Sequence, residues 1–506
     1  MSQHILAIDQ GTTGSTVLVV DVGAATEGSR VGRTIGRATT EFPQHFPAPG
    51  WVSHDPDEIW SSVETSAREA LRNAGIPGEK VAAIGITNQR ETTLVWDRAT
   101  HKPIDAAVVW QCRRTADVCS ALKEDPATTL QVREKTGLVI DAYFSATKIA
   151  WLLDHVPGAR ARAEAGELAF GTIDSFLVNR LTGGSVHVTD VTNASRTLLM
   201  NLEHGDWDAE LARIFRVPVR VLPRIVGSAE PVGTTRGVDF LPDGIPIAGI
   251  AGDQQAAMFG QACFIEGDAK CTYGTGAFAL MNIGDRPILS HHGLVTTVAW
   301  RVQGRTTYAL EGSAFIAGAA VQWLRDGLAI IARASEIEAL ARSVPSSQGV
   351  VFVPALAGLG APHWDQEARG IITGLTRATT RAHLARATLE GIAFEVRDLL
   401  DAMSKDSGRK LKRLRADGGA AANDLLMQFQ ADVADVVVER PADVESTGRG
   451  AAMLAALGAG VIHGMDEAAA MAGLESTFQP QMAPAERSGH LARWNEALGR
   501  ARSTRG

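Results

Sequence analysis

A short strand, a glycine-containing turn and a second short strand occur twice in this chain, and this repeat constrains the fold more than any other feature. The first copy has apolar residues at 5–8, the turn Asp9-Gln10-Gly11-Thr12-Thr13-Gly14, and β-branched or apolar residues at 17–22. The second copy has strand residues at 270–273, the turn Gly274-Thr275-Gly276 and strand residues at 277–283. The turns lie about half a chain length apart. This spacing predicts two domains of similar plan, residues 1–257 and 258–506.

Helices and strands alternate around the two turns. Further strands are predicted at 82–86, 93–96, 247–251, 411–415 and 436–438. A helix is predicted after Asp55-Pro56, where an aspartate cap and a proline precede apolar residues at helical spacing. A second, strongly amphipathic helix is predicted over 384–403, and a third from Asn423. This alternation is typical of α/β proteins.

Composition excludes several functional classes. The 506 residues include 49 Lys and Arg against 57 Asp and Glu, a formal charge of −8, which argues against a nucleic-acid partner. The longest weakly polar stretch, 451–462, is shorter than the ~20 apolar residues of a membrane helix, so no membrane insertion is expected. Four cysteines without a C-x-x-C pair favour neither a disulfide framework nor a zinc site. We expect a soluble, cytoplasmic protein.

The nucleotide-binding motifs that are easiest to recognise are missing. The sequence contains no G-x-x-x-x-G-K-[ST], and no G-x-G-x-x-G opens a helix after a strand. The two glycine and threonine turns remain, and their backbone N–H groups and hydroxyls can surround phosphate oxygens. Either turn alone is more often an ordinary hairpin. Two such turns at equivalent places in two domains would face each other across a cleft.

Carboxylates and a third glycine pair stand beside these elements. Asp9 directly precedes the first turn, where a carboxylate can hold Mg²⁺ through water. Asp253 ends the predicted strand at 247–251, where a carboxylate can take a proton from a hydroxyl that attacks phosphorus. The alternative for Asp253 is a helix N-cap. Asp417-Gly418-Gly419-Ala420 is predicted to be a loop between strand and helix that lets a polar ligand approach the backbone, or simply a tight turn.

Two polar segments are candidates for an acceptor site. Asn88-Gln89-Arg90-Glu91 lies between two apolar strands and places fixed donors next to an acceptor, which suits a polyhydroxylated substrate. A solvated loop is the alternative for these charges. Trp110-Gln111-Cys112-Arg113-Arg114 interrupts another apolar run, although a single tryptophan is more often a core residue than the wall of a site.

Taken together, these segments resemble the FGGY carbohydrate kinases, and within them the members that act on glycerol. The resemblance is carried by residues 9–13, 85–91, 110–114, 252–255, 272–276 and 417–419, with two further signature stretches at 143–151 and 370–390. It extends from about residue 5 to about residue 500. It implies a two-domain actin-like, ribonuclease-H-like ATPase fold with the active site in the interdomain cleft. It also implies ATP-dependent phosphorylation of glycerol to sn-glycerol 3-phosphate, in glycerol uptake and degradation.

The resemblance also assigns roles to residues. Asp253 would be the catalytic base, and it would share with Asp9 the binding of Mg²⁺ through water. The predicted glycerol-binding residues are Arg90, Glu91, Trp110, Tyr143, Asp253, Gln254 and Phe278. The predicted ATP-binding residues are Thr12, Thr13, Gly14, Thr16, Thr275, Gly318, Gln322, Gly419 and Asn423. A homodimer or homotetramer is expected.

The sequence departs from the family pattern in three places. Thr16 stands where many members carry an arginine that reaches the phosphates. The segment Val22–Arg33 is longer than usual and is predicted to be a surface hairpin extension, and Gly233–Gly244 lacks the glycine-dense effector loop of some bacterial members. Two other functions stay open: a pentulose or hexulose kinase of the same family, and an actin-like nucleotide switch without a small acceptor.

Overall fold

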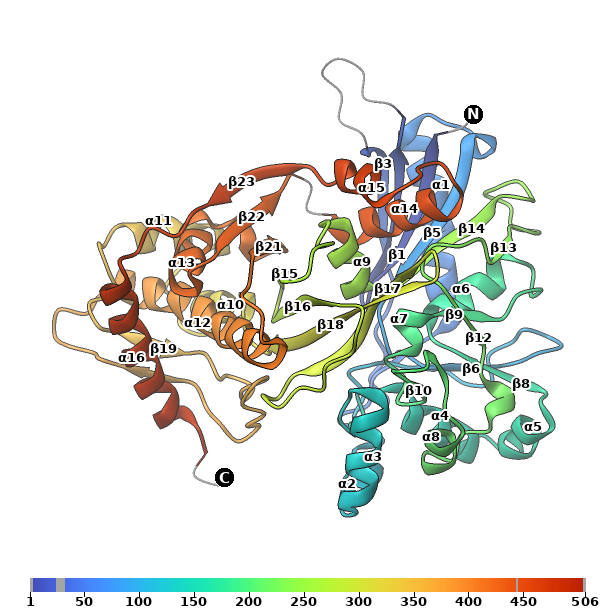
Figure 1. Cartoon of the computed structure of the whole chain (residues 1–506), viewed down its shortest axis with the longest axis horizontal. Coiled ribbons are helices and arrows are strands. Elements are labelled where there is room, and N and C mark those ends of the chain that lie inside the picture. Colours follow the sequence, from blue (N-terminus) through green and yellow to red (C-terminus); the bar gives the residue numbers. More distant parts are fainter. Residues whose placement is uncertain (1–2, 24–31, 443–444, 504–506) are drawn as a thin grey trace.

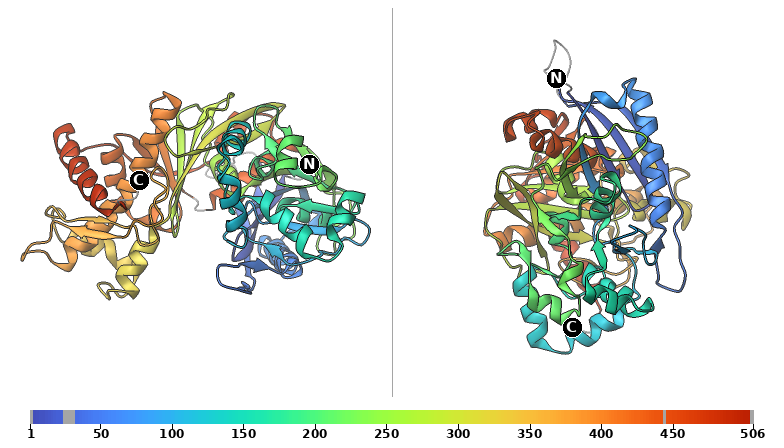
Figure 2. Two further views of the ribbon diagram at one scale, coloured as in Figure 1. Left: turned by 90° about the horizontal axis from the view of Figure 1, so that it is seen from below. Right: turned by 90° about the vertical axis from the view of Figure 1, so that its right-hand side faces the viewer.

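The computed structural model describes residues 3–23, 32–442 and 445–503, and it is built around two large β-sheets (Figure 1). One sheet lies in each half of the molecule, and the views of Figure 2 show the corresponding two lobes. The hairpin extension predicted at Val22–Arg33 falls mainly on residues outside the described part of the chain.

The first sheet has six strands in the order β13-β14-β5-β1-β2-β3. β1 pairs antiparallel with β2, β2 pairs antiparallel with β3, and β5 pairs in parallel with both β1 and β14. The buried residues of β1 and β2 are almost all β-branched or apolar, which is typical of a strand covered on both faces. The strands are β1 (His4–Gln10), β2 (Gly14–Asp21), β3 (Arg33–Glu41), β5 (Val81–Asn88), β13 (Gly233–Thr234) and β14 (Pro246–Gly252).

The second sheet has seven strands in the order β17-β18-β16-β15-β21-β22-β23. Its central strands repeat the first sheet, because β15 is antiparallel to β16 and parallel to β21, and β21 is parallel to β22. The predicted strand–turn–strand repeat is therefore present as a repeat of sheet topology. The strands are β15 (Asp268–Tyr273), β16 (Ala277–Gly284), β17 (Val295–Val302), β18 (Arg305–Ala314), β21 (Arg413–Asp417), β22 (Val437–Pro441) and β23 (Leu474–Phe478).

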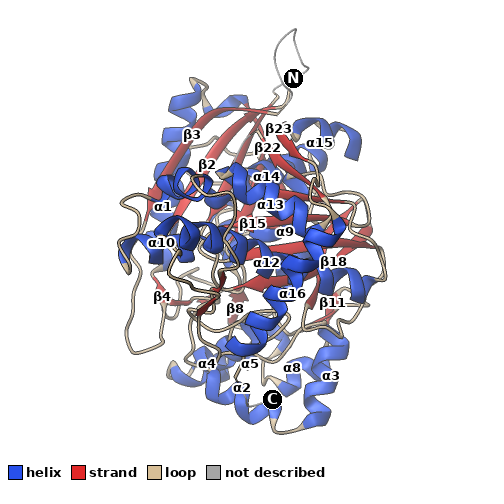
Figure 3. Ribbon diagram, turned by 90° about the vertical axis from the view of Figure 1, so that its left-hand side faces the viewer, coloured by secondary structure: helices blue, strands red, loops and turns tan. Residues whose placement is uncertain are grey.

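Helices cover both sheets, and the cap expected at Asp55 sets the start of one of them (Figure 3). α1 (Pro56–Ala74) begins at Pro56, and the Asp55 carboxylate accepts a hydrogen bond of 2.8 Å from Asp57 N. α1 packs against β2 and β3. α12 (Arg381–Ser407) covers the second sheet, and α13 (Asp424–Ala434) begins after the Asn423 cap, whose Oδ1 accepts from Leu426 N at 2.9 Å.

One helix from late in the chain belongs to the core of the first sheet. α14 (Ser446–Gly458) packs against β1, β5 and β14 and crosses α9 (Asp253–Gly260). The crossing is close because both helices carry glycine there: a Cβ on Gly450 would lie 1.8 Å from Ala256 O. The apolar stretch 451–462 is thus mainly a buried core helix. The domain boundary at residue 257 falls inside α9 and stays a prediction.

The remaining elements surround this framework. Seven helices lie between β5 and β14: α2 (Ala116–Lys123), α3 (Pro126–Thr136), α4 (Ser145–His155), α5 (Ala159–Ala165), α6 (Ile173–Leu181), α7 (Val191–Ala194) and α8 (Ala209–Ile214). Short strands flank both sheets: β4 (Ser53–His54), β6 (Leu94–Asp97), β7 (Ala107–Val108), β8 (Leu168–Gly171), β9 (Val188–Asp190), β10 (Met200–Asn201), β11 (Asp206–Trp207), β12 (Arg224–Val226), β19 (Val351–Val353) and β20 (Ile371–Thr373). The second half also carries α10 (Gly318–Asp326), α11 (Ile337–Arg342), α15 (Met465–Met471) and α16 (Pro484–Ala501). None of the described helices combines the length and apolar character that a membrane span requires.

Candidate active site

The first glycine turn is a tight hairpin between β1 and β2. Gly11 N donates to Gly14 O at 2.9 Å, and this hydrogen bond leaves Thr12 and Thr13 at the tip, with Thr13 exposed. The Trp110 indole Nε1 donates to Thr12 Oγ1 at 2.9 Å, and the Gln44 amide donates to Thr12 O at 2.9 Å. The tip is therefore held from the side by groups of other segments.

The second glycine turn has the same form between β15 and β16. Gly274 N donates to Gly276 O at 2.9 Å, and both Gly274 and Thr275 are exposed. The start of α10 holds this turn from behind, because Gly318 N donates to Gly274 O at 2.9 Å and Ala317 N donates to Thr275 O at 2.8 Å. Gln322 is exposed one turn further along α10. The structure thus brings together Thr275 and Gly318, two of the predicted ATP-binding residues.

The third glycine element lies at the same edge of the second sheet. β21 is parallel to β15, so the loop that follows Asp417 meets the end of β15. Gly418 has a φ of 86°, and a Cβ there would lie 2.6 Å from Tyr273 O. Both the left-handed backbone and the close approach require glycine. Gly419 is exposed beside it, and Asn423 is half-buried at the start of α13.

Asp253 is the first residue of α9 and directly follows β14, so it begins a helix where it was expected to end a strand. The N-cap interpretation is wrong, because Gly252 occupies the cap position. Asp253 Oδ1 accepts from Gln254 N at 2.7 Å and lies 3.1 Å from Arg90 Nε. Among the described residues, Oδ2 accepts no hydrogen bond, and the side chain is 33% exposed. This carboxylate has one fixed oxygen and one oxygen that a ligand can reach.

Arg90 and Glu91 form the turn that follows β5, and both are buried. Glu91 has a φ of 60°, a left-handed conformation that costs a residue other than glycine about 1 kcal/mol. Two hydroxyls secure the turn: Ser145 Oγ donates to Glu91 O at 3.1 Å, and Thr93 Oγ1 donates to the same oxygen at 3.0 Å. The solvated-loop alternative for this segment is wrong.

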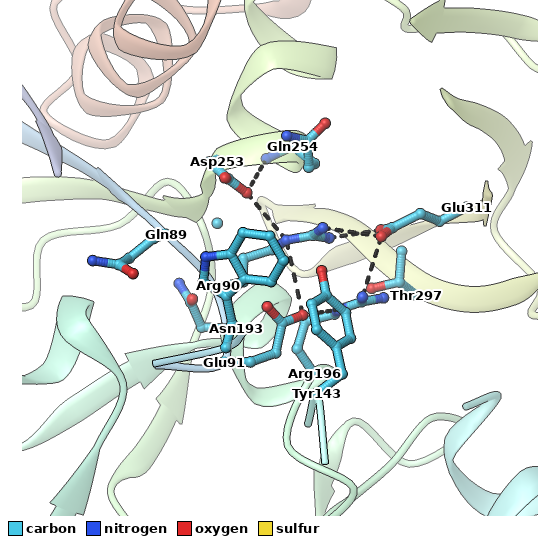
Figure 4. A network of polar contacts seen from close by, with 12 residues as sticks. Gln89, Arg90, Glu91, Tyr143, Asn193, Arg196, Asp253, Gln254, Thr297 and Glu311 are labelled. Atoms are coloured by element: carbon cyan, nitrogen blue, oxygen red, sulfur yellow. Dashed lines mark hydrogen bonds and ion pairs between the residues drawn. The ribbon is translucent and has the colours of Figure 1, made fainter. Parts of the chain in front are cut away.

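Two charged residues that the sequence did not single out complete this group (Figure 4). Glu311, on β18, receives Arg90 Nη1 at 2.6 Å and Arg90 Nη2 at 2.9 Å. Arg196, which follows α7, donates through Nε to Glu91 Oε1 at 2.6 Å and through Nη2 to Glu311 Oε1 at 3.1 Å. A single carboxylate in the apolar run 308–314 was the available signal for Glu311. Its main partner lies 221 positions away in the sequence.

Gln254 points its amide oxygen towards a buried lysine. Lys270 Nζ donates to Gln254 Oε1, and also to Thr272 Oγ1 at 2.9 Å. Burial lowers the pKa of Lys270, although the nearby carboxylate of Asp417 opposes this. Because its oxygen is occupied, the Gln254 amide presents its NH₂ group for further contacts. Phe278 is half-buried on β16, in register with Thr272 on β15.

Two aromatic side chains lie beside Arg90 and Glu91. Trp110 and Tyr143 meet edge to face, with ring centroids 5.6 Å apart. The Tyr143 ring also lies 5.6 Å from the Arg196 guanidinium carbon. Burial raises the pKa of the Tyr143 hydroxyl well above its usual range, and the charge of Glu91 adds to this effect. The hydroxyl therefore stays protonated and can donate a hydrogen bond.

Asp9 lies at the end of β1, close enough to Asp253 for their charges to interact. Burial, together with the negative charges of Asp253 and Glu445, raises the pKa of Asp9 to about 8. A cation whose other ligands are water and phosphate oxygens would favour the ionised form of this carboxyl. Within the described residues, no three His, Cys, Asp or Glu side chains form a metal-binding group by themselves. Thr16 lies further along β2, where its hydroxyl pairs with Thr39 Oγ1 at 2.9 Å.

The chain belongs to a family of kinases, which are phosphoryl-transfer enzymes. The model for the FGGY family of carbohydrate kinases, N-terminal domain, matches residues 4–260, and that for the C-terminal domain of the same family matches residues 269–459. The chain belongs to the FGGY family of carbohydrate kinases.

Its relatives point to one branch of that family. The chain is 57% identical over 502 residues to the glycerol kinase of Myxococcus xanthus, and the match covers 99% of both chains. It is also 57% identical over 500 residues to the glycerol kinase of Deinococcus radiodurans, covering 99% of this chain and 98% of the relative. The solved structure of Plasmodium falciparum glycerol kinase with ADP matches with a TM-score of 0.92 at 36% identity, covering 98% of both chains. The predicted actin-like, ribonuclease-H-like fold is confirmed.

Proposed function

We propose that this chain transfers the γ-phosphoryl group of ATP to a terminal hydroxyl of glycerol, forming ADP and sn-glycerol 3-phosphate. One observation carries the proposal: Asp253 has a reachable carboxylate oxygen at the point where a buried Arg90–Glu91 turn meets the start of α9. The whole-length similarity to glycerol kinases supports the same acceptor.

The acceptor pocket has the chemistry of a small polyol site. Arg90 and the Gln254 amide supply donors, and Glu91 supplies an acceptor, since its Oε1 is occupied by Arg196 and no described residue donates to Oε2. Trp110 supplies an apolar wall against a carbon chain. Hydrogen bonds to charged groups contribute about 1.5–3 kcal/mol each, so few contacts are enough for a three-carbon ligand. Tyr143 and Phe278 stay proposed contacts.

Asp253 is the proposed general base. Its Oδ1 is fixed by Gln254 N and Arg90, so Oδ2 takes the proton of the acceptor hydroxyl as the hydroxyl oxygen attacks the γ-phosphorus. The bond between that phosphorus and the β-phosphate oxygen breaks, and ADP leaves. The carboxylate of Asp253 and the guanidinium of Arg90 keep the attacking oxygen in place.

The nucleotide contacts are proposed from the two hairpins. Thr12, Thr13 and Gly14 would hold the β- and γ-phosphates from one side and Thr275 from the other. The half-buried Gly318 and Asn423 and the exposed Gln322 and Gly419 would contact the rest of ATP. Asp9 and Asp253 fit a hydrated Mg²⁺, which would offset phosphate charge when bound. Thr16 lies on the same hairpin and stays a proposed contact.

The wider setting is also a proposal. A cytoplasmic location and a role in glycerol uptake and degradation fit the buried, unpaired state of the four cysteines and the names of the relatives. A homodimer or homotetramer stays a prediction that light scattering would measure.

The function is tested by measuring ADP formation with glycerol, xylulose, gluconate and ribulose as acceptors. We expect kcat/KM for glycerol to exceed that of the other three. A preference for xylulose, gluconate or ribulose would replace glycerol with another acceptor of the family. ADP release that does not depend on any acceptor would favour the nucleotide switch.

A further inference from the structure

Four buried charges form a closed ring behind the proposed acceptor pocket. Going round the ring, Arg90 pairs with Glu311, Glu311 with Arg196, and Arg196 with Glu91. The ring closes where Arg90 Nε lies 4.0 Å from Glu91 Oε1. All four side chains are at most 5% exposed, and opposite charges alternate (Figure 4).

The four members are not equivalent. Arg90 also faces Asp253, and Glu91 has an oxygen to which no described residue donates. Both oxygens of Glu311 are already occupied: Oε2 by Arg90 Nη1, and Oε1 by Arg90 Nη2 and Arg196 Nη2. A carboxylate so occupied has little capacity left for a ligand. Glu311 therefore binds Arg90 and Arg196 and does not bind a substrate.

Arg196 holds Glu91 in the way that Glu311 holds Arg90. Its Nε holds Glu91 Oε1, and its guanidinium carbon lies 5.6 Å from the Tyr143 ring and 5.1 Å from the Phe144 ring. The two rings and the two carboxylates fix the plane of this guanidinium. Arg196 therefore sets which oxygen of Glu91 is occupied and which is available.

The electrostatics agree with this division. Burial opposes ionisation of Glu311, but the guanidinium groups of Arg196 and Arg90 outweigh it and lower the pKa to about 2. Burial raises the pKa of Glu91, which the same two arginines oppose. Glu311 is thus the firmly ionised centre of the ring. A buried charge that loses its partner is strongly unfavourable, so the ring members depend on one another.

We propose that Glu311 and Arg196 are positioning residues for the acceptor: Glu311 orients the guanidinium of Arg90, and Arg196 orients the carboxylate of Glu91. The inference rests on the proposed function, in which Arg90 and Glu91 contact a polyol. It adds that a strand of the second sheet, β18, fixes the acceptor site carried by the turn after β5. The acceptor site is therefore built from both halves of the chain.

The test measures KM for glycerol, KM for ATP, kcat and the melting temperature of Glu311→Gln and Arg196→Lys. Lysine keeps the charge of Arg196 but cannot hold Glu91 and Glu311 together in a fixed plane. We expect KM for glycerol to rise about ten- to hundredfold in both variants, because each variant weakens oriented hydrogen bonds between a charged side chain and the acceptor. KM for ATP should stay within about twofold.

Asp268→Asn is the matched control, because Asp268 is a buried carboxylate that receives Arg413 Nε at 3.0 Å and Nη2 at 2.8 Å. It should lower the melting temperature and leave KM for glycerol unchanged. If Glu311→Gln and Arg196→Lys behave like this control, the positioning role is wrong. If Glu311→Gln does not fold, Arg196→Lys and the charge-balanced pair Glu311→Gln with Arg196→Gln give the same comparison. Should the wild-type protein prefer another acceptor, the proposed function fails, and KM for that acceptor tests the positioning role.

Discussion

The two hairpins look alike in sequence but are held in different ways. In the first, side chains from outside the hairpin reach the tip: Trp110 donates to the Thr12 hydroxyl, and Gln44 donates to the Thr12 carbonyl. In the second, among the described residues, only backbone groups at the start of α10 donate hydrogen bonds to the tip from outside the hairpin, at Gly274 and Thr275. The first tip is thus joined to the proposed acceptor pocket, and the second to the proposed nucleotide edge.

On the proposed function, this difference would let one repeated motif contact two substrates. Each sheet supplies a tip with free N–H groups and hydroxyls that suit phosphate. The neighbours of the two tips differ, because Trp110 also packs on Tyr143 whereas Gly318 begins α10, which packs against α12. Changes at the first tip should affect both substrates, and changes at the second should affect ATP alone.

The largest expected effect comes from Asp253→Asn, which leaves both hairpins intact. The amide has nearly the same shape but cannot accept the proton from the acceptor, so kcat should fall about 10²–10⁴-fold. Glycerol binding, measured by calorimetry, should remain detectable. Retention of more than about a tenth of the wild-type kcat would show that another group is the base.

Gly318→Ala tests the second hairpin. The added Cβ would lie 2.7 Å from Gly274 O, so the tip or α10 must shift. We expect KM for ATP to rise about ten- to hundredfold, because small displacements of a positioning element are costly, and glycerol affinity to be unchanged. Gly499→Ala on α16, where nothing lies within 4 Å of the added Cβ, is the control. An equal loss of glycerol affinity would remove the distinction between the hairpins.

Trp110→Phe tests the first hairpin, and its expected effect on KM is the smallest of the three variants. Phenylalanine keeps an aromatic wall but loses the N–H that binds Thr12, a hydrogen bond that contributes about 0.5–1.5 kcal/mol. KM for glycerol and KM for ATP should both rise about two- to tenfold. Thr12→Val also removes the hydroxyl proposed to contact phosphate, but the double variant should lose less than the sum of the two single variants, since both remove the same Trp110–Thr12 bond. Fully additive losses would mean that the tip and the pocket are not coupled.

Local sequence patterns predicted the framework well. The Gly11–Gly14 and Gly274–Gly276 turns, the Asp55 cap of α1 and the Asn423 cap of α13 depend on neighbouring residues, which a single sequence displays. Strand ends were less accurate, because Asp253 begins α9 where it was expected to end a strand. Gly252 has an extended backbone and caps the helix without a side chain, so no residue type marks that boundary.

The charge ring could not be predicted in this way. Glu311 and Arg196 are single charges inside otherwise apolar or small-residue segments, a pattern that indicates burial but not the partner. Their partners come from another sheet or another loop, and only the tertiary fold brings them together. The packing of α14 on the first sheet escaped prediction for the same reason.

On the proposed function, both hairpins contact the phosphates of one nucleotide, and the first also borders the acceptor. Among the described residues, no hydrogen bond joins the two tips, and we predict that the lobes approach each other when both tips contact one nucleotide. Small-angle X-ray scattering with saturating glycerol and a non-hydrolysable ATP analogue measures this approach directly. The account predicts a smaller radius of gyration with both ligands than with neither. An unchanged scattering profile under saturation would contradict it.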